Sequence, residues 1–316
     1  LKLDHQSAIG LSESNTLLIG VSWEEERASS DYFSDGDFGP FESNFPQEKA
    51  RTTGYFIQDQ AEITDLLAVT GGIRVDEHSD FGSEVTWRIA PAVSLDEWGT
   101  TFRSSVGTGF KAPSLNQLFS SFGNPDLEAE ESTGFDVGVE QSMFDKNAKI
   151  GLTYFHNDVD NLITFDPDTF IFENIAEAKT EGLELTASAQ ITDSLNMYAG
   201  YTLTDTEDKS DGQELLRRPK NKVNAGLSFS PNEKTSLGLD ILFIGDRDDN
   251  DFSSFPATRV KLDSYTVVNL AGAYRVNQYL ELFARVNNLF DEEYEEVLGF
   301  NSVPVAAYGG FRYFFN

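Results

Sequence analysis

The chain has 316 residues, of which 39% are hydrophobic and 13% aromatic, enough for one large all-β domain or two ordinary soluble domains. Its 53 acidic residues exceed its 23 basic ones, and the formal charge of −30 repels phosphates, which argues against nucleic acid as a partner. Because cysteine is absent, disulfide bonds and thiolate metal sites are excluded.

The apolar stretches of the chain are short. The longest, such as residues 66–69 and 265–268, fall far below the roughly 18 residues that a membrane-spanning helix requires, so a helical membrane protein is excluded. The chain opens at Leu1 without the basic, apolar and small-residue series of a signal peptide. We therefore expect the true N-terminus of the protein to lie upstream.

Segments of about ten residues that alternate apolar and polar side chains follow one another along the chain and predict about fifteen β-strands. Residues 180–191, 195–204 and 222–230 are examples in which one face is apolar and the other is rich in Gly, Ser, Thr, Asn and Gln. We expect the apolar face to contact lipid and the uncharged polar face to line a wide, wet lumen. The residues predicted to face lipid are Leu185, Leu203, Val223, Leu227 and Leu239, and those predicted to face the lumen are Thr186, Asn196 and Asn224.

Short polar turns and long, acidic and aromatic connections alternate between these strands. The short turns are predicted at residues 12–15, 64–65, 96–99, 145–147, 192–194, 231–234 and 277–278. The long loops are predicted at residues 27–50, 109–131, 158–178, 205–218, 246–262 and 288–306. Such an arrangement is typical of outer-membrane barrels, whose long loops lie outside the cell. The sequence therefore predicts an all-β fold, an antiparallel up-and-down transmembrane β-barrel.

The predicted strand number is odd, whereas bacterial single-chain barrels have an even number. If the C-terminus is periplasmic, counting back about fifteen strands would start the first one outside the cell. We therefore expect residues 1–316 to be the C-terminal part of a larger barrel.

Acidic residues cluster between the predicted strands, at residues 24–26, 246–251 and 291–296. We interpret these clusters as solvated loops, and calcium binding is the alternative because hard cations prefer carboxylate oxygens. No other cofactor is predicted, and the metal site stays unknown. Since His5, His78 and His156 are scattered and no catalytic motif accompanies them, we expect the protein not to be an enzyme.

A specific motif occupies residues 107–140, which read GTGFKAPSLNQLFSSFGNPDLEAEESTGFDVGVE. Pro113 can begin a short helical turn over residues 114–119 without losing a backbone hydrogen bond, and Pro125 fixes the loop that follows. This stretch resembles the TonB-dependent receptor family, whose barrels carry the same pattern after a mid-barrel strand. The C-terminal residues 309–315 are similar to the family's final strand. Residues 174–184, 215–220 and 286–294 are most similar to its vitamin B12 (cobalamin) branch.

The resemblance implies a 22-stranded barrel in the Gram-negative outer membrane, preceded by an N-terminal plug domain and a TonB box. The plug, the box and about seven strands would then lie before residue 1. It also implies active uptake of a scarce large ligand, cobalamin first and a ferric siderophore second, powered by the TonB–ExbB–ExbD complex. A passive porin-like channel is the alternative of another class.

Ligand contacts are implied by the cobalamin branch, in which apical loops place tyrosines and an arginine over the corrin. The matching positions are Arg217 in LLRR, Phe252 and Phe255 in DFSSFP, and Phe300 in LGFN. Phenylalanine keeps the stacking surface but loses the hydroxyl, a donor that contributes about 0.5–1.5 kcal/mol. Packing of these aromatic residues on one another within the loops is an equal alternative.

Overall fold

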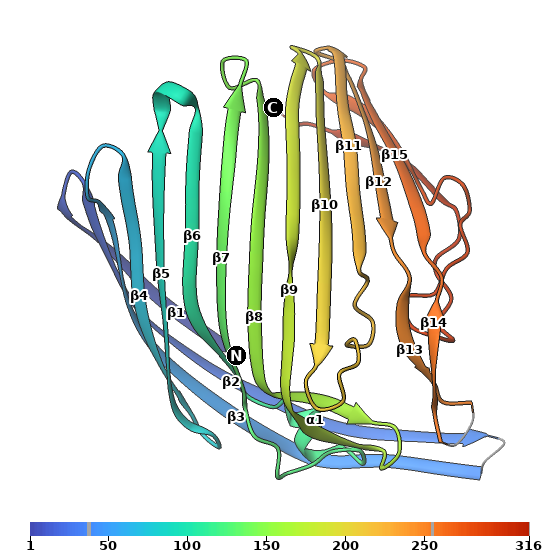
Figure 1. Ribbon diagram of the computed structural model, residues 1–316. Helices are drawn as coiled ribbons and strands as arrows, with labels where there is room; N and C mark the ends of the chain where they lie inside the picture. Colours follow the sequence, from blue (N-terminus) through green and yellow to red (C-terminus); the bar gives the residue numbers. More distant parts are fainter. Residues whose placement is uncertain (37–38, 254–255, 316) are drawn as a thin grey trace.

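The computed structural model describes residues 1–36, 39–253 and 256–315 (Figure 1). Fifteen strands form one antiparallel sheet in which each strand pairs with its neighbours in chain order, apart from the inserted hairpin β13–β14 between β12 and β15. The sheet strands are β1 (Lys2–Ser12), β2 (Asn15–Gly36), β3 (Gly39–Glu62), β4 (Leu67–His78), β5 (Gly82–Leu95), β6 (Thr100–Lys111), β7 (Glu130–Met143), β8 (Ala148–Asp166), β9 (Ile171–Thr192), β10 (Leu195–Asp208), β11 (Asn221–Asn232), β12 (Thr235–Ile244), β15 (Tyr265–Arg275), β16 (Leu280–Asn287) and β17 (Ala306–Tyr313). The predicted all-β, up-and-down fold is confirmed.

The sheet curves into an open arc, and all seven predicted short turns join consecutive strands at its upper end in Figure 1. The turn at Asp96–Trp98 is a single 3₁₀ turn that Gly99 closes in the left-handed region, with φ of 65°. Among the described residues, no helix is long and apolar enough to cross a membrane.

Two of the predicted long loops are wrong, because these segments are mostly β-hairpins whose strands continue almost to the tip. The β2–β3 ladder runs out to the pair Gly36 and Gly39, and the β8–β9 ladder to Asp166 and Ile171. In these hairpins backbone donors and acceptors pair with each other beyond the apolar part of the wall. Beyond the apolar wall these strands pack against other loops, as Phe45 and Phe172 do, so the alternation that marks the other strands does not reveal them. A third loop, residues 246–262, contains the separate hairpin β13 (Arg247–Asp251) and β14 (Thr258–Leu262).

The helical turn predicted over residues 114–119 is confirmed as α1 (Leu115–Phe119). Ser114 and Gln117 form a capping box: the Gln117 backbone N–H donates to Ser114 Oγ at 3.3 Å, and Gln117 Oε1 accepts from the Ser114 backbone N–H at 2.8 Å. The side chains of Leu115 and Leu118 are buried. The helix therefore fixes the 112–129 loop against the loop end of β2 and β3.

The strand register separates two faces. On one, which we call the outer face, Leu185 lies opposite Tyr201 and Tyr201 opposite Val223, so apolar side chains form continuous rows. On the other, the inner face, Thr186 and Asn224 both lie opposite Gly200. The period-two division predicted from the sequence is therefore present in the sheet.

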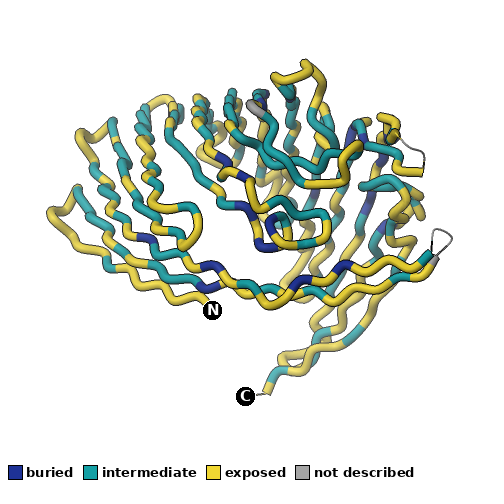
Figure 2. Tube along the Cα trace, turned by 90° about the horizontal axis from the view of Figure 1, so that it is seen from below, coloured by how far each residue is buried: buried dark blue, intermediate teal, exposed yellow. Residues whose placement is uncertain are grey.

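Large apolar side chains on the outer face stay uncovered. Val137, Leu152 and Leu185 are 53%, 46% and 42% exposed, and Ile73 and Trp87 continue the same face at 46% and 39%. A water-soluble surface does not carry so extended an apolar patch. Buried residues gather instead at the loop end, where the long connections fold over one another (Figure 2). The buried core of the described chain therefore lies among its packed loops.

Candidate functional site

Aromatic rings from four connections meet at the loop end, centred on Phe165 near the tip of the β8–β9 hairpin. Its ring centroid lies 5.9 Å from that of Phe122, 5.5 Å from Phe172 and 6.2 Å from Phe252, all edge to face. Such pairs stabilise by about 0.5–1.5 kcal/mol beyond their buried area. The members of this aromatic cluster are Tyr32, Phe41, Phe122, Phe165, Phe170, Phe172 and Phe252.

A cavity of about 550 Å³ lies beside the aromatic cluster and shares Phe165 with it. Three segments form this mouth cavity: the tip of the β8–β9 hairpin, the 208–218 loop, and the β13–β14 hairpin. Its apolar wall consists of Leu162, Ile163, Phe165, Ile175, Leu215 and Leu216. A volume of this size is within the roughly 300–1,000 Å³ of small-molecule sites.

Acidic side chains line the rest of the mouth cavity: Asp166, Asp168, Glu173, Asp208, Asp211 and Glu214. Burial, and then the neighbouring charges of Asp166 and Asp208, raise the pKa of Glu173. Two arginines also line the cavity, but Arg259 is already paired, since its Nε lies 2.7 Å from Asp248 Oδ2. The cavity thus combines an apolar wall with an excess of negative charge.

Arg217 is held at two points, neither of them a ligand. Its Nε donates to Asp249 Oδ1 at 2.8 Å, and its backbone N–H donates to the Asp248 carbonyl at 2.8 Å. These contacts hold Arg217 in the left-handed region, with φ of 59°, a conformation costly for a residue other than glycine. The Arg217 side chain is 43% exposed, and its chain neighbours Leu216 and Arg218 line the mouth cavity.

The carboxylate of Asp249 joins three loops, and sequence reasoning missed it. It has no exposed surface, and it accepts hydrogen bonds from Arg217, from the Leu298 backbone N–H at 2.9 Å and from the Asn250 backbone N–H at 2.9 Å. Burial opposes ionisation, but these donors outweigh it and hold the pKa of Asp249 below its usual value. The sequence predicts a solvated Asp249 like its acidic neighbours, and only the burial of its carboxylate, which the sequence does not show, sets it apart.

The four predicted ligand contacts are only partly brought together. Phe252 joins the aromatic cluster through Phe165, and Phe255 lies outside the described residues. Phe300 is 72% exposed, two residues beyond Leu298, so Asp249 links its loop to Arg217. Nothing in this geometry tests contact with a ligand, and the four assignments stay predictions.

The 288–305 loop lies against the inner face of β12 and β15. The rings of Tyr265 and Tyr294 stack with centroids 4.0 Å apart, and the Arg247 guanidinium lies 5.3 Å from the Tyr265 centroid. The Asn288 side chain donates to the carbonyls of Glu292, at 2.9 Å, and Val303, at 3.2 Å. This loop is therefore a fixed part of the mouth.

The family model for the TonB-dependent receptor-like β-barrel matches residues 1–289. The chain belongs to this family. Its place is therefore the bacterial outer membrane. In a barrel of this kind we expect the apolar outer face to meet lipid and the loop end to face the cell exterior.

Solved receptor structures share the fold along the whole chain. The ferric enterobactin receptor PfeA of Pseudomonas aeruginosa, as a G324V mutant, superposes with a TM-score of 0.78 at 22% identity, over 99% of this chain and 53% of that one. The siderophore receptor PirA of Acinetobacter baumannii gives 0.76 at 18%, and the ferric-catecholate import receptor Fiu of Escherichia coli K12 gives 0.77 at 17%, each over 99% of this chain and 54% of the receptor. The chain spans about half the length of these receptors.

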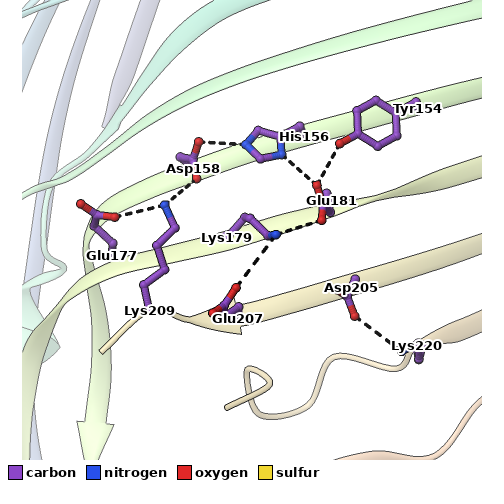
Figure 3. Close-up of polar contacts among 10 residues, drawn as sticks. All are labelled: Tyr154, His156, Asp158, Glu177, Lys179, Glu181, Asp205, Glu207, Lys209 and Lys220. Atoms are coloured by element: carbon purple, nitrogen blue, oxygen red, sulfur yellow. Dashed lines mark hydrogen bonds and ion pairs between the residues drawn. The ribbon is translucent and has the colours of Figure 1, made fainter. Parts of the chain in front are cut away.

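A ladder of paired charges crosses the outer face of this family barrel just beyond its apolar rows (Figure 3). Lys179 Nζ donates to Glu181 Oε1 at 2.9 Å, and Glu181 Oε2 also accepts from the Tyr154 hydroxyl at 2.9 Å. On the same face, the next residues along these strands away from the loop end are Leu183 and Leu152, which are apolar. Because unpaired charges are costly in hydrocarbon, the ladder marks where the wall leaves the lipid. Its remaining members are His156, Asp158, Glu177, Asp205, Glu207, Lys209 and Lys220.

Metal binding has no assembled site in the part of the chain that the structure describes, where no group of three or more His, Asp or Glu side chains could hold an ion. In the acidic run 246–251, Asp246 lies 2.8 Å from Lys261, and Asp248 and Asp249 pair with arginines. Calcium binding stays an untested prediction.

Proposed function

We propose that the complete receptor imports a ferric siderophore across the outer membrane, driven through TonB. The observation that carries the proposal is the mouth cavity, which lies against the aromatic cluster at the outward end of a TonB-dependent receptor barrel. A passive channel has no need of a cavity with both an apolar wall and convergent polar groups. No catalytic role is part of the proposal.

The choice of a ferric siderophore over cobalamin reverses the order of ligands that the sequence resemblance implies. The receptors named above are described as siderophore or ferric-catecholate receptors, and none as a cobalamin transporter. At 17–22% identity they establish only the fold, so the ligand is inferred. Cobalamin stays the second candidate.

Coupling to the TonB–ExbB–ExbD complex belongs to the same proposal. The solved receptors are about twice as long as this chain, which supports the expected plug, TonB box and further strands in the complete protein.

Growth under iron limitation tests this function. The complete gene product is expressed in an iron-starved host that lacks its own siderophore receptors, and growth is followed with a panel of ferric siderophores. We expect one of them to restore growth, and deletion of TonB to abolish the effect. Restoration that persists without TonB would instead identify a porin-like channel, and TonB-dependent uptake of cobalamin alone would identify the vitamin as the ligand.

A further inference from the structure

We propose that the mouth cavity selects a metal chelate of net positive charge and rejects polyanionic chelates. The inference rests on the proposed uptake function and specifies its substrate class. It does not follow from the solved receptors, two of which are described as handling ferric enterobactin or ferric catecholates.

The charge of the protein is concentrated where a ligand would arrive. The six long connections, residues 27–50, 109–131, 158–178, 205–218, 246–262 and 288–306, contain 29 acidic and 9 basic residues. They account for −20 of the −30 formal charge. A field of one sign over a concave surface concentrates ions of the opposite sign and slows the approach of like charges, with effects on association of about 10- to 1,000-fold.

The cavity carboxylates differ from other acids at the loop end in what they contact. Asp158 and Glu177 share Lys209, and Asp246 pairs with Lys261, so each of these carboxylates has a cationic partner within the protein. Among the described residues, none of the six cavity acids has a cationic partner within 4.0 Å. Asp166 and Asp208 contact only hydroxyl and backbone donors, at Thr169 and Asp168 and at Ser210 respectively.

The cationic side chains in the cavity do not offset these charges. Arg259 is committed to Asp248 and also donates to Gln213 Oε1 at 3.0 Å. With Arg259 paired, Arg218 is the one remaining cation among the described residues of the lining. Six carboxylates line the same cavity, so negative charge is in excess. A cation that enters the cavity therefore supplies the missing partner, whereas a trianion meets repulsion from the six carboxylates.

The apolar wall limits what kind of cation fits. Leu162, Ile175, Leu215 and Phe165 offer an apolar surface that a hydrated metal ion would not use. An organic chelate with apolar linkers and a charged amine would place its body against this wall and its amine among the carboxylates. The class is thus a cationic chelate, with hydroxamate iron ligands and a free amine as the simplest example.

Equilibrium binding to the purified complete receptor tests the inference at low and high salt. The probes are ferrioxamine B, which carries a free ammonium, its N-acetyl derivative, which is neutral, and a ferric tricatecholate of charge −3. We expect the cationic chelate to bind about tenfold more tightly than the neutral one at low salt, and the anionic chelate to bind weakest. High salt should reduce the differences.

A charge-matched pair of variants locates the effect. Glu173→Gln removes one charge inside the cavity, and Asp246→Asn removes one outside it. Only Glu173→Gln should reduce the preference for the cationic over the neutral chelate, by several-fold. Equal or tighter binding of the tricatecholate, or an unchanged preference in Glu173→Gln, overturns the charge selection and leaves the uptake function standing. Failure of every ferric chelate to bind and to promote TonB-dependent growth overturns both.

Discussion

Arg217 and Asp249 form an ion pair in which the carboxylate is wholly buried and the arginine side chain is partly exposed, with Nε and Oδ1 2.8 Å apart. The pair joins the 208–218 loop to β13, and the second oxygen of Asp249 holds the 288–305 loop through the Leu298 backbone N–H. One carboxylate therefore contacts three segments of the mouth and helps to fix their relative position.

Replacing Asp249 with alanine should loosen this part of the mouth. The change leaves three donors without their acceptor, and each such loss costs about 1–3 kcal/mol in a buried setting. We expect faster proteolysis of the loops in the complete receptor held in detergent, and weaker ligand binding, with the barrel still folded. Asp246→Asn, at an exposed ion pair, is the control and should behave like wild type. Unchanged proteolysis of Asp249→Ala would show that the loops hold without this residue.

Acid should weaken the same contact. Because the folded pKa of Asp249 lies below its usual value near 4, the carboxylate contributes stability that is complete above about pH 4. That stability is lost as the pH falls through the lowered pKa. Loop proteolysis by an acid-active protease should therefore rise below about pH 4 in wild type. It should change less with pH in Asp249→Asn, and an identical acid response of the two proteins would assign the effect to other carboxylates.

The sequence was most informative where one physical constraint acts on every second residue. Lipid on one side and water on the other impose period two, so the strands, the short turns and the faces of Leu185 and Thr186 could be predicted. The extended hairpins could not, because near Asp35 and Phe172 the strands pack against other loops rather than between lipid and lumen, so no simple period marks them. The mouth cavity and Asp249 depend on contacts among segments far apart in the chain, which alternation does not encode. The motif at residues 107–140 identified the family, but its match does not extend to the ligand.

The two faces of β11 give a direct test of membrane orientation. Leu227 lies on the outer face opposite Leu239, and Ser228, the next residue, lies on the inner face opposite Gly238. Arginine at Leu227 should lower the free energy of unfolding of the complete receptor by about 2–4 kcal/mol, because the charge enters hydrocarbon. Arginine at Ser228 enters a wet lumen and should cost much less. A denaturant titration in lipid vesicles measures both, and equal costs would refute the assignment of the faces.

Phe165 and Phe300 separate two roles for aromatic residues at the mouth. Phe165 contacts Phe122, Phe172 and Phe252 and also lines the mouth cavity, whereas Phe300 is 72% exposed. Phe165→Ala should therefore weaken ligand binding by about 2 kcal/mol or more, as at a binding hot spot, and should also speed proteolysis of the loops. Phe300→Ala should leave proteolysis unchanged, because few contacts are lost. If Phe300→Ala nevertheless weakens equilibrium binding by about 1 kcal/mol or more, Phe300 contacts the ligand, as the sequence resemblance predicts. If Phe165→Ala binds the ligand like wild type, the mouth cavity is not where the ligand rests.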